Sequence, residues 1–219
     1  MYFIKSPYIL SKLTGKSIIW KMPEGKKRIF LTFDDGPIPE ITPSILQLLT
    51  DYQIKATFFC VGENIQKYPH IFEQILNEGH EVGCHTFNHL NGWKTPKEEY
   101  IQNISKCNNY IQTNLFRPPY GKATPAQIEL IKEDYFTILW SVLSGDFDIS
   151  ISGEQCLQNV INNTEDGSIV VFHDNIKAKN RLMFALPRFI EYFLSQGFAF
   201  ESIKYDELIE TRDKTGSNK

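Results

Sequence analysis

Acidic, histidine and arginine side chains recur at the ends of apolar, strand-like segments of this 219-residue chain. Asp34 and Asp35 follow the first such segment, and His85 and His89 follow the third. The side chains placed in the same way after later segments are Arg117, Tyr120, Asp146, Asp148, His173 and Asp174. In a parallel α/β fold the carboxyl ends of the strands share one face, so these groups can converge. The pattern predicts one chemical site at that edge of a sheet.

The spacing of His85 and His89 can place two imidazoles on one metal ion if the intervening turn is helical. With a nearby carboxylate, such a site suits zinc hydrolysis or ferrous oxygen chemistry. Asp34 and Asp35 are adjacent carboxylates, which are costly in an apolar frame unless a cation neutralises them. Because successive side chains at a strand end point differently, one Asp can bind metal while the other acts as a base. The competing interpretation is a solvated turn with a fortuitous histidine pair.

Two further side chains have both a chemical and a structural interpretation. Arg117 precedes a rigid proline pair and can bind a buried carboxylate and hold its rotamer, or can lie on the surface. His173 closes an apolar segment and can serve as a general acid, since its unperturbed pKa is about 6.5. A buried structural histidine is the alternative.

The elements that must position these groups alternate between strand-like and helix-like patterns from about residue 28 to 204. The strand-like segments are residues 28–33, 56–60, 81–84, 115–117, 135–142, 168–172 and 198–203. Helix-start signals stand at Thr42, Thr95, Thr124 and Ser152, the second and third with the form of a capping box. About seven strand–helix units without a linker predict one α/β domain with parallel strands. Periodicity leaves open a closed barrel or an open sheet.

Composition narrows the class of protein. Lys and Arg total 23 against 26 Asp and Glu, and this near-balance argues against broad nucleic-acid binding. No apolar run approaches the ~18 residues of a membrane span, so we expect no stable membrane insertion. The four cysteines form no C-x-x-C pair, which argues against a thiolate zinc site. The sequence leaves the oligomeric state open.

The expected organisation has three parts. Residues 1–27 form an N-terminal extension packing on the barrel, residues 28–205 the barrel itself, and residues 206–219 a polar C-terminal tail. The first residues lack the apolar core and cleavage site of a signal peptide, so we expect a cytoplasmic protein, with a periplasmic or cell-envelope location left open.

Five motifs occur in order along the chain. They are residues 32–37 (TFDDGP), 85–89 (HTFNH), 117–120 (RPPY), 140–148 (WSVLSGDFD) and 171–173 (VFH). Over roughly residues 28–203 the sequence thereby resembles the polysaccharide deacetylases of carbohydrate esterase family 4, also called the NodB homology domain. The resemblance implies a distorted (β/α)7 TIM-like barrel in a single domain, with a divalent metal, usually zinc, in an open groove.

The resemblance also implies the roles of individual residues. The implied metal ligands are Asp35, His85 and His89. The implied catalytic residues are Asp34 as general base, His173 as general acid, Arg117 holding Asp34, and Tyr120, whose backbone N–H joins an oxyanion hole. The implied reaction removes N-acetyl groups from N-acetylglucosamine units of a polysaccharide or oligosaccharide and releases acetate.

Two positions depart from the family pattern. Leu143 stands where the family usually has an Asp that helps to orient the Arg, and Asp146 and Asp148 are the candidates to replace it. Phe147 stands where a Trp is usual, and with Val171 it would line the acetyl pocket. Further candidates for the substrate pocket are Trp93, which could stack on a sugar, and Asp146.

Three alternatives remain open from the sequence. One is a metal-dependent amidase of the same fold that acts on a non-sugar amide. Another is a catalytically impaired homologue that binds a glycan. The third is a ferrous oxygenase, which gives no joint role to Asp34, Arg117 and His173. The glycan, its chain length and the physiological metal are also left open.

Overall fold

Strand β2 (Arg28–Asp34) lies at the centre of the fold, and all seven of its residues are buried. The computed structural model describes residues 2–6 and 18–216. Within these ranges β2 pairs in parallel with β3 (Thr57–Cys60) along one edge and β8 (Ile169–His173) along the other. The short strand β9 (Ala199–Glu201) pairs with the first residues of β2. This central strand ends at Asp34, so its carboxyl end is the place where the candidate site begins.

One curled parallel sheet contains all the described strands. The others are β1 (Ile18–Ile19), β4 (Glu81–Cys84), β5 (Leu115–Phe116), β6 (Phe136–Ile138) and β7 (Val142–Leu143). Their order is β1-β6-β5-β4-β3-β2-β8-β7, with β9 beside β2. Strands β6 and β7 lie near opposite ends of this order, yet only residues 139–141 join them. Because so short a connection spans about 14 Å at most, the two ends of the sheet must curl toward each other.

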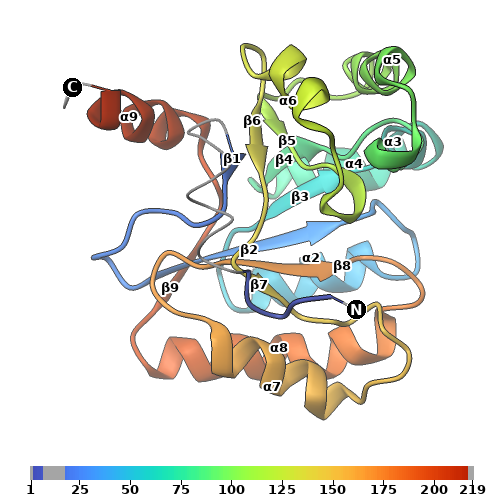
Figure 1. The fold of residues 1–219 in the computed structure, drawn as a ribbon. Helices are drawn as coiled ribbons and strands as arrows, with labels where there is room; N and C mark the ends of the chain where they lie inside the picture. Colours follow the sequence, from blue (N-terminus) through green and yellow to red (C-terminus); the bar gives the residue numbers. More distant parts are fainter. Residues whose placement is uncertain (1, 7–17, 217–219) are drawn as a thin grey trace.

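This architecture confirms the expected distorted (β/α)7 barrel in a single domain, in an open rather than fully closed form (Figure 1). One detail of the prediction is wrong. Residues 135–142 read as a single strand, but the structure divides them between β6 and β7. The reason is that β6 pairs with β5 whereas β7 pairs with β8, so the chain must cross from one end of the sheet to the other between them.

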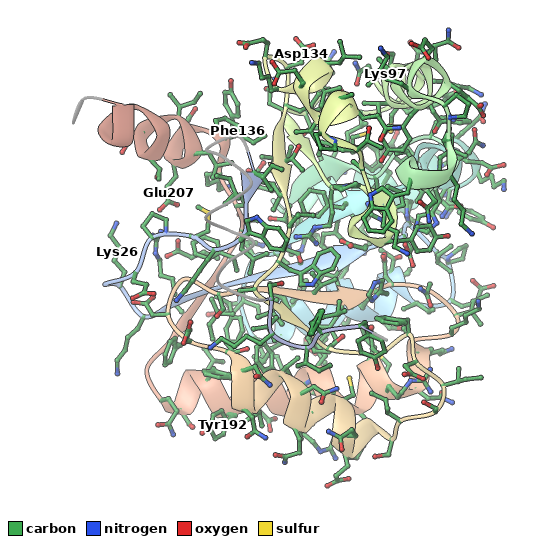
Figure 2. All side chains as sticks on the ribbon, in the orientation of Figure 1. Lys26, Lys97, Asp134, Phe136, Tyr192 and Glu207 are labelled. Atoms are coloured by element: carbon green, nitrogen blue, oxygen red, sulfur yellow. The ribbon has the colours of Figure 1, made fainter. Side chains whose placement is uncertain are left out.

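Helices cover the outer face of the sheet. They are α2 (Thr42–Asp51), α3 (Gly62–Lys67), α4 (Pro69–Asn77), α5 (Lys97–Cys107), α6 (Pro125–Ile131), α7 (Gly153–Asn163) and α8 (Lys179–Ser195). The last helix, α9 (Tyr205–Gly216), packs instead against the inner side of the sheet through Leu208. Figure 1 shows α7 and α8 side by side under β8, and α3, α5 and α6 on the opposite flank. Side chains fill the space between sheet and helices, while labelled residues such as Lys26, Lys97 and Tyr192 point outward (Figure 2).

The helix-start signals were correct at two positions and wrong at two. Thr124 forms the expected capping box with Gln127, and Ser152 caps α7. Thr42 is not an N-cap, because its hydroxyl is engaged by the turn after β2. Thr95 donates to the Asn91 carbonyl instead of capping α5.

Period-two alternation along the strands separates two cores. On β2, Ile29, Leu31 and Phe33 point toward the helices and belong to the larger core. Phe30 points into the barrel, where it joins a smaller core with side chains such as Phe59 of β3. Because Thr32 and Asp34 share the parity of Phe30, they also face the barrel interior. The strand thus carries a polar pair into the barrel at its carboxyl end.

Both ends of the described chain pack on the barrel. Strand β1 pairs with β6, and Lys5 forms an antiparallel bridge with Val142 of β7. Residues 7–17 of the expected extension lie outside the described residues. The expected polar tail is instead the helix α9 as far as Gly216, because Leu208 inserts into the smaller core and Glu207 pairs with the buried Arg28. Among the described residues, no helix combines the length and the apolar character needed to cross a membrane.

The contact between α9 and β2 generates a stability prediction. Arg28 is only 6% exposed and is paired with Glu201 at 3.0 Å and Glu207 at 2.6 Å. Glu207→Ala should lower the free energy of unfolding by about 1–2 kcal/mol, between the values for exposed and buried pairs. Asp206→Ala, at an exposed position of the same helix, is the control in chemical denaturation. Equal stability of the two variants would show that the pair contributes nothing.

Candidate functional site

A groove of about 830 Å³ opens at the carboxyl ends of the central strands. It is lined by Tyr2, Asp34, Asp35, Ile38, His85, His89, Tyr120, Lys122, Trp140, Leu143, Phe147, His173, Asn175, Ile176 and Lys177. These residues end or follow β2, β4, β5, β6, β7 and β8, except for Tyr2 of the N-terminal segment. The parallel sheet therefore brings together polar groups that are far apart in the sequence.

Asp35 is held rigidly at the bottom of this groove. Its backbone has a φ of 89°, a conformation that few non-glycine residues adopt. The Asn64 amide donates to the Asp35 carbonyl at 2.7 Å, and the Asn175 amide donates to Asp35 Oδ2 at 2.5 Å. These contacts leave Oδ1 directed at two imidazoles. Burial opposes ionisation, but the hydrogen bond from His89 and the nearby imidazoles hold the pKa of Asp35 well below its usual range.

His85 and His89 face that carboxylate. Their Nε2 atoms lie 3.7 and 3.0 Å from Asp35 Oδ1, and the three possible ligand atoms lie within 4.8 Å of one another. His85 Nδ1 lies 2.7 Å from the carbonyl of Arg117, which can only accept, so Nδ1 carries the proton and Nε2 presents its lone pair. Burial lowers the pKa of His85 to about 4 despite the nearby Asp34. The His85 imidazole is therefore neutral at neutral pH.

Asp34 lies on the inner side of the barrel and forms an ion pair with Arg117. The Asp34 carboxylate accepts from Arg117 Nη1 at 2.7 Å, and the two side chains are 4% and 0% exposed. Arg117 Nη1 also donates to the Thr32 hydroxyl at 2.7 Å. Its Nε and Nη2 donate to the carbonyls of Ile138 and Leu139 at 3.0 and 3.2 Å. The guanidinium is thus fixed from several directions.

The expected Asp that would orient Arg117 is replaced by Leu143 in this chain. Main-chain carbonyls and the Thr32 hydroxyl hold Arg117 instead. Within the described residues neither Asp146 nor Asp148 hydrogen-bonds Arg117. Asp148 instead accepts from Tyr2 and from the backbone N–H of Ser150.

Asp146 is the partner of His173. The Asp146 carboxylate is fully buried; Oδ1 lies 2.7 Å from His173 Nδ1, and Oδ2 accepts from the His173 backbone at 2.7 Å. Burial by itself lowers the pKa of His173, but Asp146, with Asp35 and Asp34 nearby, raises it to about 9. His173 is therefore protonated at neutral pH, with Nδ1 turned to Asp146. The sequence placed Asp146 in the substrate pocket, whereas the structure places it behind the histidine.

Asp174 holds the turn that carries Asp35. It is 1% exposed and accepts from the Gly36 N–H at 2.8 Å and from the Thr42 hydroxyl at 2.6 Å. A Cβ added at Gly36 would overlap this carboxylate, so the turn requires glycine there. Burial raises the pKa of Asp174 to about 8, and the negative charge of Asp35 adds to the rise.

Comparison with known proteins now identifies the family. A sequence profile described as polysaccharide deacetylase matches residues 21–138, more than half of the chain. The chain belongs to the polysaccharide deacetylase family. The resemblance drawn from the five motifs is confirmed.

Individual members of the family are similar over most of this chain. It is 35% identical over 193 residues to a peptidoglycan-N-acetylglucosamine deacetylase of Bacillus cereus, covering 85% of this chain and 91% of that protein. A chitooligosaccharide deacetylase of Azorhizobium caulinodans is 32% identical over 162 residues, 70% of this chain and 77% of that protein. The crystal structure of a peptidoglycan N-acetylglucosamine deacetylase with a bound naphthyl-substituted N-hydroxybenzamide matches with a TM-score of 0.83 and 32% identity, covering 90% of this chain and 95% of that chain.

The other expected site residues of this polysaccharide deacetylase family member are spread around the groove. Tyr120 has a φ of 61°, and its ring lies 4.7 Å from that of His89. Phe147 lines the groove, its ring 5.1 Å from that of His173. Val171 is fully buried in β8 and is not part of the lining, where Leu143 lies instead. Trp93 is 66% exposed and lies outside the lining, beside Lys122.

Sequence reasoning missed several residues that support the site. Thr32 lies within a quoted motif at a strand position that faces the barrel interior, so strand parity could have found it. Asn175 lies two residues beyond the end of β8 and had no such signal. Asp174 was placed with the other polar groups at the strand ends but was given no role. The position of Tyr2 in the groove could not be predicted from the sequence, because nothing in the local pattern shows that the first residues run along β7.

The turn around Asp35 generates a second prediction. Asp174→Ala leaves the buried Gly36 N–H and Thr42 hydroxyl without their acceptor, at about 1–3 kcal/mol each. We expect the free energy of unfolding to fall by about 2–5 kcal/mol, and zinc affinity to fall because Asp35 loses its fixed direction. Asp174→Asn, which keeps one acceptor oxygen, should lose less of both. Zinc titration and chemical denaturation measure the two effects, and wild-type zinc affinity in a folded Asp174→Ala variant would contradict the role.

Proposed function

We propose that this protein hydrolyses the N-acetyl group of N-acetylglucosamine units in a polysaccharide or oligosaccharide and releases acetate. The observation that carries the proposal is the arrangement of side chains in one groove. Three side chains that can bind a metal ion, Asp35, His85 and His89, lie there together with two ion pairs. The Asp34–Arg117 pair leaves a carboxylate facing the groove, and the Asp146–His173 pair leaves a protonated imidazole there. The deacetylase activities for which the similar proteins are named support the same reaction.

A divalent metal, which we propose to be zinc, fits the cluster of Asp35, His85 and His89. Two imidazoles and one carboxylate are a ligand set that zinc enzymes use while keeping positions open. His85 is fixed with its lone pair toward the cluster, and Asp35 offers Oδ1 while Asn175 occupies Oδ2. When bound, such an ion polarises a carbonyl oxygen and lowers the pKa of water.

The base and the acid are separate side chains. Asp34, which Arg117 holds by its Oδ1, accepts a proton from the attacking water. His173 donates the proton on Nε2 to the departing amine nitrogen, because Asp146 holds Nδ1. The backbone N–H of Tyr120 is proposed to donate to the oxyanion of the tetrahedral intermediate. The products are acetate and a glucosamine unit.

The substrate is an N-acetylated glycan. Similar proteins are named as deacetylases of peptidoglycan and of chito-oligosaccharides. The exposed aromatic rings of Tyr120 and Trp93 near the groove favour a sugar over a small non-sugar amide, since such rings can pack on sugar faces. A cytoplasmic location stays a prediction; if it holds, soluble fragments or precursors are better candidates than intact wall.

Replacing the base tests the proposed mechanism. Asp34→Asn keeps the shape and an acceptor for Arg117 but cannot take a proton, so we expect the rate of acetate release from chito-oligosaccharide to fall by about 100-fold or more. Zinc binding should persist, because Asp34 is not in the ligand cluster. Asp35→Asn is the matched variant and should weaken zinc binding as well. Wild-type turnover in Asp34→Asn would remove Asp34 as the base, and a wild-type protein that binds the glycan without releasing acetate would favour the impaired homologue.

The Asp146–His173 pair predicts a pH effect. The pKa of His173 is raised to about 9 in the folded protein, from about 6.5 in the unfolded chain. The contribution of the Asp146–His173 pair to folding stability is therefore complete below about pH 6.5 and is lost as pH rises through about 9. Asp146→Asn removes the partner charge, so the alkaline limb of kcat/KM should move to lower pH by about one unit or more. Asp134→Asn, at the outer rim in Figure 2, is the control. An unmoved alkaline limb in Asp146→Asn would rule out His173 as the acid.

A further inference from the structure

The N-terminal segment runs along the free edge of β7, next to the groove. Lys5 and Val142 form an antiparallel bridge, and the Leu143 N–H donates to the Ile4 carbonyl at 2.8 Å. The Ser6 N–H donates to the Ser141 carbonyl at 3.0 Å. These bonds fix the register of residues 4–6 on the sheet. The segment therefore runs beside β7 and extends the barrel wall at this edge (Figure 1).

This register carries Tyr2 to the mouth of the groove. In an antiparallel pair, a step back along one segment matches a step forward along the other. Because Lys5 is opposite Val142, Tyr2, three residues before Lys5, is opposite Gly145, three residues after Val142. A Cβ added at Gly145 would lie 3.2 Å from the Tyr2 hydroxyl, so the glycine leaves room for that hydroxyl. The hydroxyl donates to Asp148 Oδ2 at 2.8 Å. Burial and that hydrogen bond raise the pKa of Tyr2 to about 12, so it remains a donor at every working pH.

The Tyr2 ring is the outermost of three rings in series. Its centroid lies 5.0 Å from that of Phe147, whose ring lies 5.1 Å from the His173 imidazole. Tyr2 and Phe147 line the groove together with Leu143 and Trp140. This is the enclosed apolar side of the groove, since Leu143 is 5% exposed while Ile176 on another part of the lining is 69% exposed.

We propose that Tyr2 is a specificity-determining residue whose ring closes the acyl side of the groove and restricts the N-acyl group to acetyl. The inference rests on the proposed deacetylase function. The leaving nitrogen must lie within reach of His173 Nε2, and the acyl carbon is one bond away from it. A methyl group gains most where apolar side chains exclude water, which is beside Phe147 and Leu143. The sugar, with its many hydroxyl groups, occupies the open side.

The ring of Tyr2, rather than its hydroxyl, carries the selectivity in this proposal. The hydroxyl ties the ring to Asp148, while the ring itself limits the length of the acyl chain. Three variants separate the possibilities. Tyr2→Ala removes the wall, Tyr2→Phe keeps the ring, and Phe3→Ala changes the adjacent side chain of the same strand, which is 66% exposed and absent from the lining.

The first experiment measures kcat/KM on chito-oligosaccharides bearing N-acetyl, N-propionyl or N-butyryl groups. Wild type, Tyr2→Phe and Phe3→Ala should share one strong preference for acetyl. In Tyr2→Ala the ratio of acetyl to propionyl kcat/KM should fall about 10-fold or more, the range for one methylene in an apolar pocket. A Tyr2→Ala variant that releases acetate with the wild-type acyl preference would overturn the proposal.

A binding measurement keeps this result independent of turnover. Zinc-loaded wild type and variants are titrated calorimetrically with acetohydroxamate, propionohydroxamate and butyrohydroxamate. Tyr2→Ala should gain affinity for the longer chains relative to acetohydroxamate, whereas Phe3→Ala should not. Unchanged relative affinities in a folded Tyr2→Ala protein reject the role of Tyr2. Failure of the proposed function is distinct, because wild type would then bind the hydroxamates with the expected chain-length preference but release no acyl group from any of the glycans.

Discussion

The buried ion pair between Arg117 and Asp34 is the contact on which the rest of the site depends. Both charges lie inside the barrel, where losing one partner would leave the other uncompensated at about 3–5 kcal/mol. The pair persists because the guanidinium has further acceptors and lies 4.0 Å from the Phe59 ring. The Arg117 carbonyl at the same time orients His85. One residue thus fixes the direction of the proposed base and of a proposed ligand.

This network explains how the site accommodates Leu143. An acidic side chain there would add a second negative charge near a guanidinium that already has one. In this chain the carbonyls at the break between β6 and β7 supply the missing acceptors without adding charge. The break that sequence periodicity did not predict is therefore part of the site, because the crossing segment turns the carbonyls of Ile138 and Leu139 toward Arg117.

The sequence predicted well whatever depends on strand polarity. Parallel strands must end on one face, so Asp34, His85 and His173 could be assigned to a common edge before their distances were known. The sequence also predicted the helix cap at Thr124, where all the hydrogen-bonding partners are close along the chain. It did not predict the role of Thr42, because the Thr42 hydroxyl donates to the carboxylate of Asp174, which is distant in sequence, instead of capping a helix.

Long-range pairing set the other limit on prediction. The path of residues 2–6 is decided by the free edge of β7, and that edge exists only once the sheet has formed. The helical form of α9 likewise depends on Arg28, which is buried in β2 and attracts Glu207. Neither partner is visible in the local pattern, so these segments read as an extension and a polar tail.

The charges of the site are arranged so that acid and base can coexist at one pH. Asp34 faces a fixed cation and His173 faces a buried anion, and each pair is internally neutral. A single shared environment would act on a carboxylate and an imidazole together, whereas here the two groups have separate counterions. Asp35 stands between the two pairs as the carboxylate without a permanent counterion. In a barrel interior that charge needs a partner, and the two imidazoles beside it supply the geometry in which a divalent cation would be that partner.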